Sequence, residues 1–269
     1  MSSVQSVDGK VAVITGAGSG IGRATALALA ARGAAVCVSD LDPSRAEAVA
    51  AQITAAGDRA TGVRCDVTSD DDVAALADVT RSTFGRVDIV MSNVGVIARG
   101  MPLDIPIAAW SSIVDVNLLG TVRVLQAFLP ALLEQGSGHV VTTGSTAGLF
   151  PYSVDRMPYV VTKAGVVALT ESLALYLRPR GIGVTCFCPA GVITNIAEQM
   201  RVYGPPTAIQ MPQLPLISAE QAGELVVSGI LEDRLLVLSD PQAEAMVVQH
   251  ATDREAFVRA QTAYVEGAT

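Results

Sequence analysis

The sequence predicts an α/β fold with one parallel sheet of about seven strands flanked by helices. Short apolar runs alternate with longer helical patterns along the chain, which is typical of parallel βαβ units with right-handed crossovers. The strands are continuous apolar runs, as expected when helices cover both faces of a sheet. A glycine-rich turn follows the first of them. Together these features predict a Rossmann-type, doubly wound architecture, and 269 residues fit one such domain, residues 1–269.

Seven apolar runs are the expected strands: residues 11–15, 35–39, 60–65, 87–91, 139–143, 182–188 and 235–238. Helical patterns fill the intervals, with long ones over about 107–133 and 218–232 and another around Tyr159. Residues 195–217 break the alternation with four prolines and scattered apolar side chains, and we expect them to form a substrate lid. The stretch around 240–265 is expected to be one long C-terminal helix.

Composition narrows the function classes. A hydrophobic content of 50% with 16% charged residues indicates a compact, well-buried fold. The net charge of −8 makes nucleic acid or an anionic membrane surface an unfavourable partner. The four cysteines lack metal-ligand spacing, so reduced core thiols and no metal site are expected. No signal peptide or uninterrupted membrane span is recognised, and we expect a soluble cytoplasmic protein.

The turn TGAGSGIG at residues 15–22 has the glycines that a tight strand-to-helix turn and a bound pyrophosphate require, at Gly16, Gly20 and Gly22. Asp40 ends the second strand, where a carboxylate can hydrogen-bond the adenosine ribose and would repel a 2′-phosphate. NAD is therefore expected rather than NADP, with Arg45 the nearby cation that could favour NADP. The alternative for Asp40 is an ordinary acidic turn residue.

Tyr159 and Lys163 lie four residues apart in an apolar helical stretch, so their side chains share one face of the helix. Alone, this pair is more typical of an amphipathic edge with a lysine that extends its ammonium to solvent. Other motifs in the chain decide whether the pair is an amphipathic edge or part of a functional site.

From about residue 8 to 200 the chain resembles the short-chain dehydrogenase/reductase family, in its compact branch. The resemblance rests on seven motifs in the family's order: TGAGSGIG (15–22), CDV (65–67), SNVG (92–95), VNLLG (116–120), GSTAG (144–148), YVVTK (159–163) and PAGVIT (189–194). Each motif could arise by chance, whereas seven in order favour a functional site.

The resemblance implies roles for particular residues. The catalytic residues would be Asn117, Ser145, Tyr159 and Lys163, with Ser145 and Tyr159 also binding substrate. The NAD-binding residues would be Gly16, Ser19, Gly20, Ile21, Gly22, Asp40, Asp66, Val67, Asn93, Gly95, Tyr159, Lys163, Pro189, Val192 and Thr194. Asp66 would face the adenine amine, Lys163 would bind the nicotinamide ribose, and the region of Val192 and Thr194 would hold the carboxamide.

Physical chemistry agrees with these roles. Moving a hydride between an alcohol and a nicotinamide also requires a proton transfer, but a tyrosine pKa of about 10 is too high for a base near neutrality. The Lys163 ammonium and the cationic nicotinamide are expected to lower the pKa of Tyr159. Ser145 would polarise the substrate oxygen, and Asn117 would anchor a proton-relaying water. Taken alone, Ser145 could be a turn residue and Asn117 a helix residue bonded to backbone.

Several positions depart from the family pattern. Ser92 and Val94 replace the first asparagine and the alanine of NNAG, and Ala190 replaces a glycine. The interval from Ser145 to Tyr159 is one residue longer than usual. The family's glycine-rich ending is missing, which puts tetramer contacts made through that ending in doubt.

The leading prediction is an NAD-dependent oxidoreductase acting on an uncharged, apolar secondary alcohol or ketone. Apolar residues of the 195–217 segment would line the pocket, and Phe150, Tyr152 and Met157 would add a wall. The alternatives are an NAD(H)-binding redox sensor, a sugar epimerase or dehydratase, and a dehydrogenase of a sugar, steroid or polyol. The expected partners are a small-molecule substrate and a second copy of the chain, in a homodimer or homotetramer.

Overall fold

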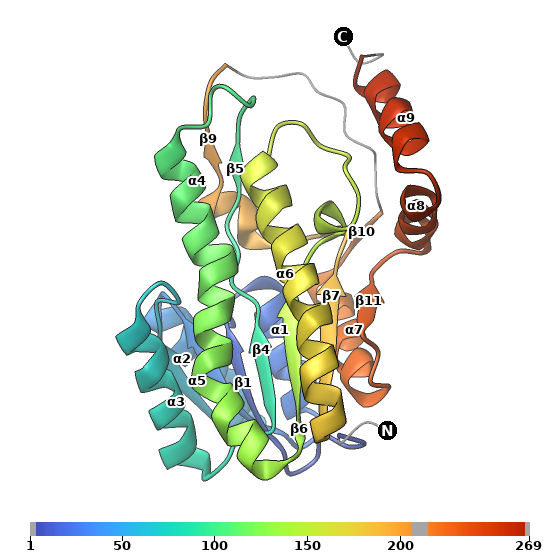
Figure 1. Ribbon diagram of the computed structural model, residues 1–269. Helices are drawn as coiled ribbons and strands as arrows, with labels where there is room; N and C mark the ends of the chain where they lie inside the picture. The colour runs from blue at the N-terminus through green and yellow to red at the C-terminus, as the bar shows by residue number, and fades with distance from the viewer. Residues whose placement is uncertain (1–3, 206–214, 267–269) are drawn as a thin grey trace.

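The computed structural model describes residues 4–205 and 215–266. Within them, seven strands form one parallel sheet in the order β11-β7-β6-β4-β1-β2-β3 (Figure 1). The strands are β1 Val11–Thr15, β2 Ala35–Asp40, β3 Ala60–Arg64, β4 Ile89–Ser92, β6 Gly138–Thr143, β7 Ile182–Cys188 and β11 Leu236–Leu238. All seven predicted strands are found; β1 and β7 have the predicted bounds, and the ends of the others differ by at most two residues. The predicted α/β, Rossmann-type fold is therefore confirmed.

Helices cover both faces of the sheet, α1, α2 and α7 on one and α3, α5 and α6 on the other (Figure 1). Side chains alternate between two cores along each strand: Ile14 packs with α1, α2 and α7, whereas its neighbour Val13 packs with the opposite layer. The helices are α1 Gly20–Ala30, α2 Pro43–Ala55, α3 Asp70–Phe84, α4 Ile107–Val114, α5 Gly120–Gln135, α6 Met157–Leu177 and α7 Ala219–Leu231.

The long helical stretch predicted over about 107–133 is continuous but irregular. A π-helical turn, Asp115–Leu119, joins α4 to α5 and holds Asn117. Such turns add a residue to one helical turn and frequently occur at functional sites. The stretch Ile107–Gln135 and the stretch Met157–Arg180 are long and apolar enough to cross a membrane by length and composition alone. In this fold, however, they are the helices that cover one face of the sheet, a position that explains their apolar composition.

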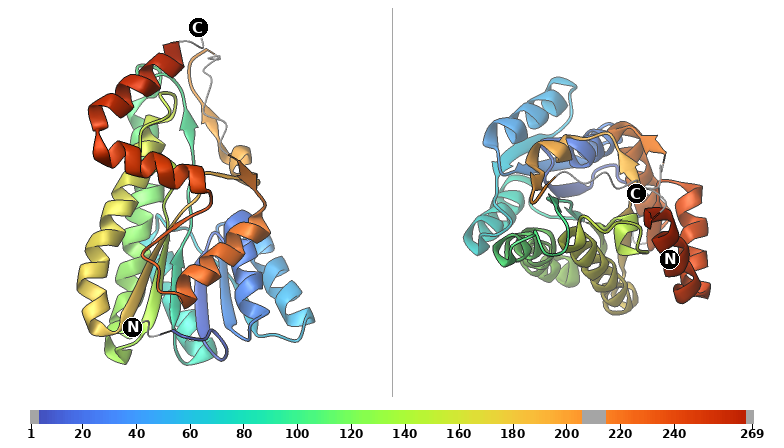
Figure 2. Two further views of the ribbon diagram at one scale, coloured as in Figure 1. Left: turned by 90° about the vertical axis from the view of Figure 1, so that its right-hand side faces the viewer. Right: turned by 90° about the horizontal axis from the view of Figure 1, so that it is seen from above.

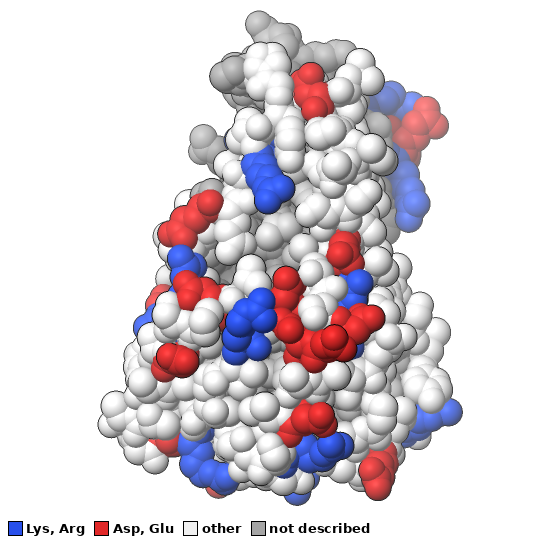
Figure 3. All heavy atoms as spheres, turned by 90° about the vertical axis from the view of Figure 1, so that its left-hand side faces the viewer, with Lys and Arg blue, Asp and Glu red and all other residues white. Residues whose placement is uncertain are grey.

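Acidic and basic side chains are mixed on the face drawn in Figure 3. Arg123 of α5 pairs with Asp70 at 2.7 Å and with Asp115 at 2.8 Å, and so connects the start of α3 to the π-helical turn. Asp70 is largely exposed, and an exposed pair of this kind contributes at most about 1 kcal/mol. The pairs therefore orient the turn more than they stabilise the fold.

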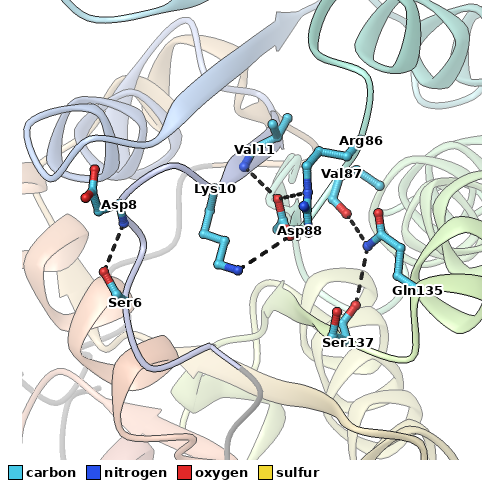
Figure 4. A network of polar contacts seen from close by, with 9 residues as sticks. All are labelled: Ser6, Asp8, Lys10, Val11, Arg86, Val87, Asp88, Gln135 and Ser137. Atoms are coloured by element: carbon cyan, nitrogen blue, oxygen red, sulfur yellow. Dashed lines mark hydrogen bonds and ion pairs between the residues drawn. The ribbon is translucent and has the colours of Figure 1, made fainter.

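One buried carboxylate joins the amino-terminal ends of β1 and β4 (Figure 4). Asp88 is 1% exposed, accepts the backbone N–H of Val11 at 2.9 Å and binds the Arg86 guanidinium at 2.6 and 2.9 Å. The Lys10 ammonium lies 3.9 Å away. These contacts set the start of β1 against the start of β4, the two strands between which the chain reverses its direction of winding.

Both described ends of the expected lid are attached to the body. β9 (Arg201–Val202) pairs with β5 (Ala98–Arg99), and β10 (Leu216–Ile217) pairs with β8 (Gly191–Val192). A short 3₁₀ helix, Asn195–Gln199, precedes β9. Ile209, Met211 and Leu214, which we expected to face substrate, lie outside the described residues.

The prediction of a single C-terminal helix around 240–265 is wrong. The structure has two helices, α8 (Pro241–Thr252) and α9 (Arg254–Glu266), set at an angle to each other (Figure 2). Asp253 has an extended backbone, and its carboxylate accepts the N–H of Ala256 at 2.9 Å, so it ends one helix and caps the next. Phe257 of α9 packs edge-on against Phe150, with ring centroids 5.9 Å apart.

This packing corrects a second expectation. Phe150 is only 2% exposed and belongs to a cluster with Ala243 and Phe257, so it anchors the C-terminal helices rather than lining the pocket. Tyr152 lies beside it, 5.7 Å between centroids, and is partly buried. The C-terminal helices thus pack against the segment between Ser145 and Tyr159 through the cluster around Phe150.

Candidate active site

A cleft lies at the carboxyl ends of the strands, where the winding reverses between β1 and β4, as expected for an open parallel sheet. The turns after six strands contribute to it. Its lining includes thirteen of the predicted residues: Gly16, Ser19, Gly20, Ile21, Asp40, Asp66, Val67, Asn93, Gly95, Tyr159, Lys163, Pro189 and Thr194. The structure therefore brings together residues that are almost 180 positions apart in the chain.

The glycine-rich turn leads directly into α1. Ser19 is the N-cap residue but makes no capping hydrogen bond with its side chain, so the N-terminus of α1 faces the cleft without that internal acceptor. A Cβ on Gly22 would lie 2.4 Å from the carbonyl oxygen of Gly16 and 2.7 Å from Asn93. Only glycine fits at this position. Gly22 therefore allows close packing of the turn against Asn93, and it does not itself line the cleft.

Asp40 closes the far end of this turn. Its carboxylate accepts the backbone N–H groups of Gly18 and Asp42 at 3.0 and 3.1 Å. Arg45, the cation that could favour a 2′-phosphate, forms ion pairs with Asp42 at 3.6 Å and Glu198 at 3.3 Å. The negative charge at this position is therefore fixed by backbone donors, and the nearby guanidinium is already paired.

Asn93 connects three strand ends. Its amide donates to the carbonyls of Thr15 and Gly16 at 3.2 and 3.3 Å, and its amide oxygen accepts the Thr143 hydroxyl at 3.0 Å. Asn93 thus lines the cleft mainly as a brace between β1, β4 and β6.

Tyr159 and Lys163 lie on the first turns of α6 and face the same cleft. Lys163 is 3% exposed, and its ammonium donates to the carbonyl oxygen of Thr143 at 2.6 Å. A Cβ on Gly95 would come within 3.2 Å of that ammonium, so the glycine leaves room for it. The Tyr159 hydroxyl hydrogen-bonds the side chain of Ser145, which is itself buried at the cap of a 3₁₀ turn.

The electrostatics differ from expectation. Burial raises the pKa of Tyr159 to about 12, and the hydrogen bond with Ser145 opposes that rise. Burial also lowers the pKa of Lys163 to about 8. The Lys163 ammonium lies 5.7 Å from the centroid of the tyrosine ring and bonds to Thr143 instead. In the protein by itself, desolvation therefore outweighs the lowering of the tyrosine pKa that we expected from the lysine.

Asn117 is fully buried in the π-helical turn and does not line the cleft. Its amide oxygen accepts the N–H of Val96 at 2.8 Å, and its amide nitrogen donates to the Val96 carbonyl at 3.0 Å and to the Thr162 hydroxyl at 3.1 Å. The side chain thus joins the turn after β4 to helix α6, next to Lys163. Its bonding to backbone matches the alternative considered from sequence.

Ser145 and Val192 are absent from the cleft lining, although Ser145 reaches it through Tyr159. Val192 instead pairs in the short strand β8. Sequence analysis missed further lining residues, chiefly Leu41, Val94, Val96, Val116, Thr143, Asn195, Ile196 and Gln199. Their signal was available, because each lies within a few residues of a predicted site residue.

Comparisons with known proteins agree with this geometry. Residues 10–202 match the family model described as short chain dehydrogenase. The chain is 31% identical to the (2S)-[(R)-hydroxy(phenyl)methyl]succinyl-CoA dehydrogenase subunit BbsD of Thauera aromatica, over 97% of this chain and 96% of that one. Two solved structures are similar. The first is a short chain dehydrogenase/reductase from Burkholderia phymatum in complex with NAD, with 33% identity, a TM-score of 0.83 and coverage of 93% and 95%.

The second is the 3-ketoacyl-(acyl-carrier-protein) reductase from Brucella melitensis complexed with NADH, with 28% identity, a TM-score of 0.78 and coverage of 87% and 98%. The chain belongs to the short-chain dehydrogenase/reductase family, and it is an oxidoreductase of that family.

The lowered pKa of Lys163 predicts a pH dependence of stability. The unfolded lysine titrates near 10.5 and the folded one near 8, so between these values the unfolded chain binds more protons and stability rises with pH. Relative to Lys163→Met, the wild-type free energy of unfolding should increase by on the order of 2–3 kcal/mol across this interval. Urea unfolding of both proteins from pH 7.5 to 10 measures the difference. A constant difference would mean that the ammonium is not buried as described.

Proposed function

We propose that the protein is an NAD-dependent dehydrogenase that moves a hydride between the nicotinamide and an uncharged, apolar secondary alcohol or ketone, with Tyr159 as the acid/base. The observation that supports this most strongly is the arrangement at the base of α6. There the Tyr159 hydroxyl hydrogen-bonds the Ser145 side chain, and Lys163 is buried one helical turn further along the helix.

The residues present fit NAD. The N-terminus of α1 opens on the cleft at a turn that tolerates no Cβ at Gly22, which suits a pyrophosphate. The carboxylate of Asp40 suits ribose hydroxyls and opposes a 2′-phosphate. Two relatives in the same family were solved with NAD or NADH.

In the proposed mechanism the cleft residues would hold NAD, which would supply the hydride chemistry when bound. Ser145 donates a hydrogen bond to the substrate oxygen and so orients it toward the tyrosine. Tyr159 takes the hydroxyl proton during oxidation and returns it during reduction. Lys163 holds positive charge behind the tyrosine, where Gly95 and the Thr143 carbonyl fix its position. Asn117 keeps the turn after β4 in register with α6, and we propose that a proton-relaying water binds beside it.

Exposed apolar side chains on the segment that follows the cleft-lining residue Pro189 support an apolar substrate. Ile193, Val202 and Leu216 are 65%, 61% and 68% exposed and lie on or beside the described parts of the 195–217 segment. Those described parts contain one cation, Arg201. We propose that this segment acts as a lid that closes over an alicyclic, aromatic or terpenoid-like alcohol.

A second candidate substrate class is suggested by the relatives. One is a (2S)-[(R)-hydroxy(phenyl)methyl]succinyl-CoA dehydrogenase subunit and another a 3-ketoacyl-(acyl-carrier-protein) reductase, so an acyl thioester is the main competitor. Sugar, steroid and polyol alcohols remain alternatives. A redox sensor that binds NAD(H) without turnover is disfavoured because Tyr159 and Lys163 are both in place.

A panel of substrates tests both points. Apolar secondary alcohols, polyols, sugars and hydroxyacyl thioesters are offered with NAD and with NADP, and the reduced cofactor is followed by its absorbance. We expect kcat/KM to rise with substrate hydrophobicity and NAD to be preferred. A preference for anionic substrates would point to Arg201 or Arg156 as an anion clamp, and a preference for NADP would contradict the role of Asp40.

Tyr159→Phe tests the mechanism, because it removes the hydroxyl while keeping the packing of α6. Turnover should fall by several orders of magnitude, and NADH binding measured by fluorescence should be largely kept. A variant that retains a tenth of wild-type turnover would show that Tyr159 is not the acid/base.

We further propose a homodimer or homotetramer. The outer face of α6 carries exposed apolar side chains, with Val161 at 52% and Leu175 at 82% exposure. Light scattering at micromolar concentration should give a dimeric or tetrameric mass, and a monomer would contradict the proposal.

A further inference from the structure

An ion pair joins two segments that border the cleft near Asp40. Arg45 comes from the first turn of α2, and its guanidinium lies 3.3 Å from a carboxylate oxygen of Glu198. Glu198 belongs to the short 3₁₀ helix Asn195–Gln199, whose residues line the cleft. The pair therefore connects positions that are 153 residues apart in the chain.

Arg45 is anchored beside the carboxylate of Asp40. A Cβ built on Gly18 would lie 2.6 Å from the Cβ of Arg45 and 2.7 Å from a carboxylate oxygen of Asp40, so both side chains flank this one glycine. Arg45 also lines a polar hollow that shares Ser19 and Gly20 with the cleft. Asp40 is the residue that would meet the adenosine ribose. An arginine anchored next to it is long enough to bring its guanidinium to a phosphate on that ribose.

The position of Arg45 calls for counter-charges. The first turn of α2 is the positive end of the helix dipole, where a cation is unfavourable. Asp42, the N-cap residue, lies 3.6 Å from Nε of Arg45, and Glu198 supplies the second carboxylate. Asn195 donates to the other oxygen of Glu198, so both oxygens of this carboxylate are bonded. The hydrogen bonds from Asn195 and Arg45 hold the pKa of Glu198 below its ordinary value, and Glu198 is therefore ionised at neutral pH.

We propose that Glu198 is a specificity-determining residue for the cofactor, because its pairing with Arg45 keeps the guanidinium from binding the 2′-phosphate of NADP. The proposal rests on the proposed use of NAD. It assigns to Glu198 part of the discrimination that the sequence assigned to Asp40. The side chains of Arg45 and Glu198 are 39% and 53% exposed, so solvent and salt weaken the pair. Breaking an exposed pair of this kind changes an affinity by about fivefold at most.

The test measures the dissociation constants of NADPH and NADH by their fluorescence, on the full-length protein at low ionic strength. Glu198→Gln keeps the size of the side chain and removes its charge. Glu220→Gln is the matched control, because Glu220 is exposed and lines the same hollow as Arg45, while its carboxylate hydrogen-bonds the side chain of Ser218. Arg45→Gln, alone and combined with Glu198→Gln, completes a double-mutant cycle.

Glu198→Gln should lower the dissociation constant of NADPH about threefold to fivefold and change that of NADH less than about twofold. The gain should disappear when Arg45→Gln is added, since the released guanidinium is the group that binds the phosphate. Glu220→Gln should leave the ratio of the two constants at its wild-type value. The same comparison in an Asp40→Ser background, which removes the repulsion between Asp40 and the phosphate, keeps the NADPH constant in a measurable range.

An equal gain for NADH and NADPH would overturn the proposal, because the pair would then restrict a part of the cleft that both cofactors occupy. A gain that survives Arg45→Gln, or an equal gain in Glu220→Gln, would mean a general charge effect. Unchanged NADPH binding in Glu198→Gln would mean that Arg45 does not reach the phosphate. Failure of the proposed use of NAD is distinguishable, because the wild-type protein would then itself bind NADPH more tightly than NADH.

Discussion

The site depends on one unusual arrangement, the burial of the Lys163 ammonium against the carbonyl oxygen of Thr143. Removing a charge from water is unfavourable, so the surroundings must be shaped for it. Gly95 leaves the space, and Asn117 holds the adjacent turn through Val96. The end of β6, the turn after β4 and the start of α6 are thereby fixed relative to one another. Those are the elements that surround the cleft at its reacting end.

Two positions that depart from the family pattern, Ser92 and Ala190, make hydrogen bonds to neighbouring segments. Ser92 stands in place of an asparagine, and its hydroxyl lies 3.1 Å from that of Thr121, which in turn donates to the backbone carbonyl of Asn117 at 3.1 Å. Ala190 donates its N–H to the Ser239 hydroxyl at 2.9 Å, so the loop after β7 is fixed without the usual glycine. Both departing positions therefore hold hydrogen bonds that tie neighbouring segments together beside the strand ends.

The fold and most of the cleft could be predicted because their signals are local. Apolar runs identify strands, and parallel strands place the residues that follow them at one edge, as Gly16, Asp40 and Asn93 illustrate. Other properties depend on contacts that no local pattern records. The break at Asp253 interrupts a helical pattern through a single side-chain cap, and Phe150 turns toward α9 rather than the cleft. The raised pKa of Tyr159 likewise depends on burial by distant segments.

The two ends of the cleft carry opposite charges. The chain carries a net charge of −8, yet the buried ammonium of Lys163 lies at the end where proton transfer is proposed. The carboxylate of Asp40 lies at the other end, fixed by backbone donors. A dinucleotide with a ribose at each end and a pyrophosphate between them would meet the Asp40 carboxylate at its adenosine end and the Lys163 ammonium at its nicotinamide end. Because burial weakens screening, this difference in charge favours one direction of dinucleotide binding.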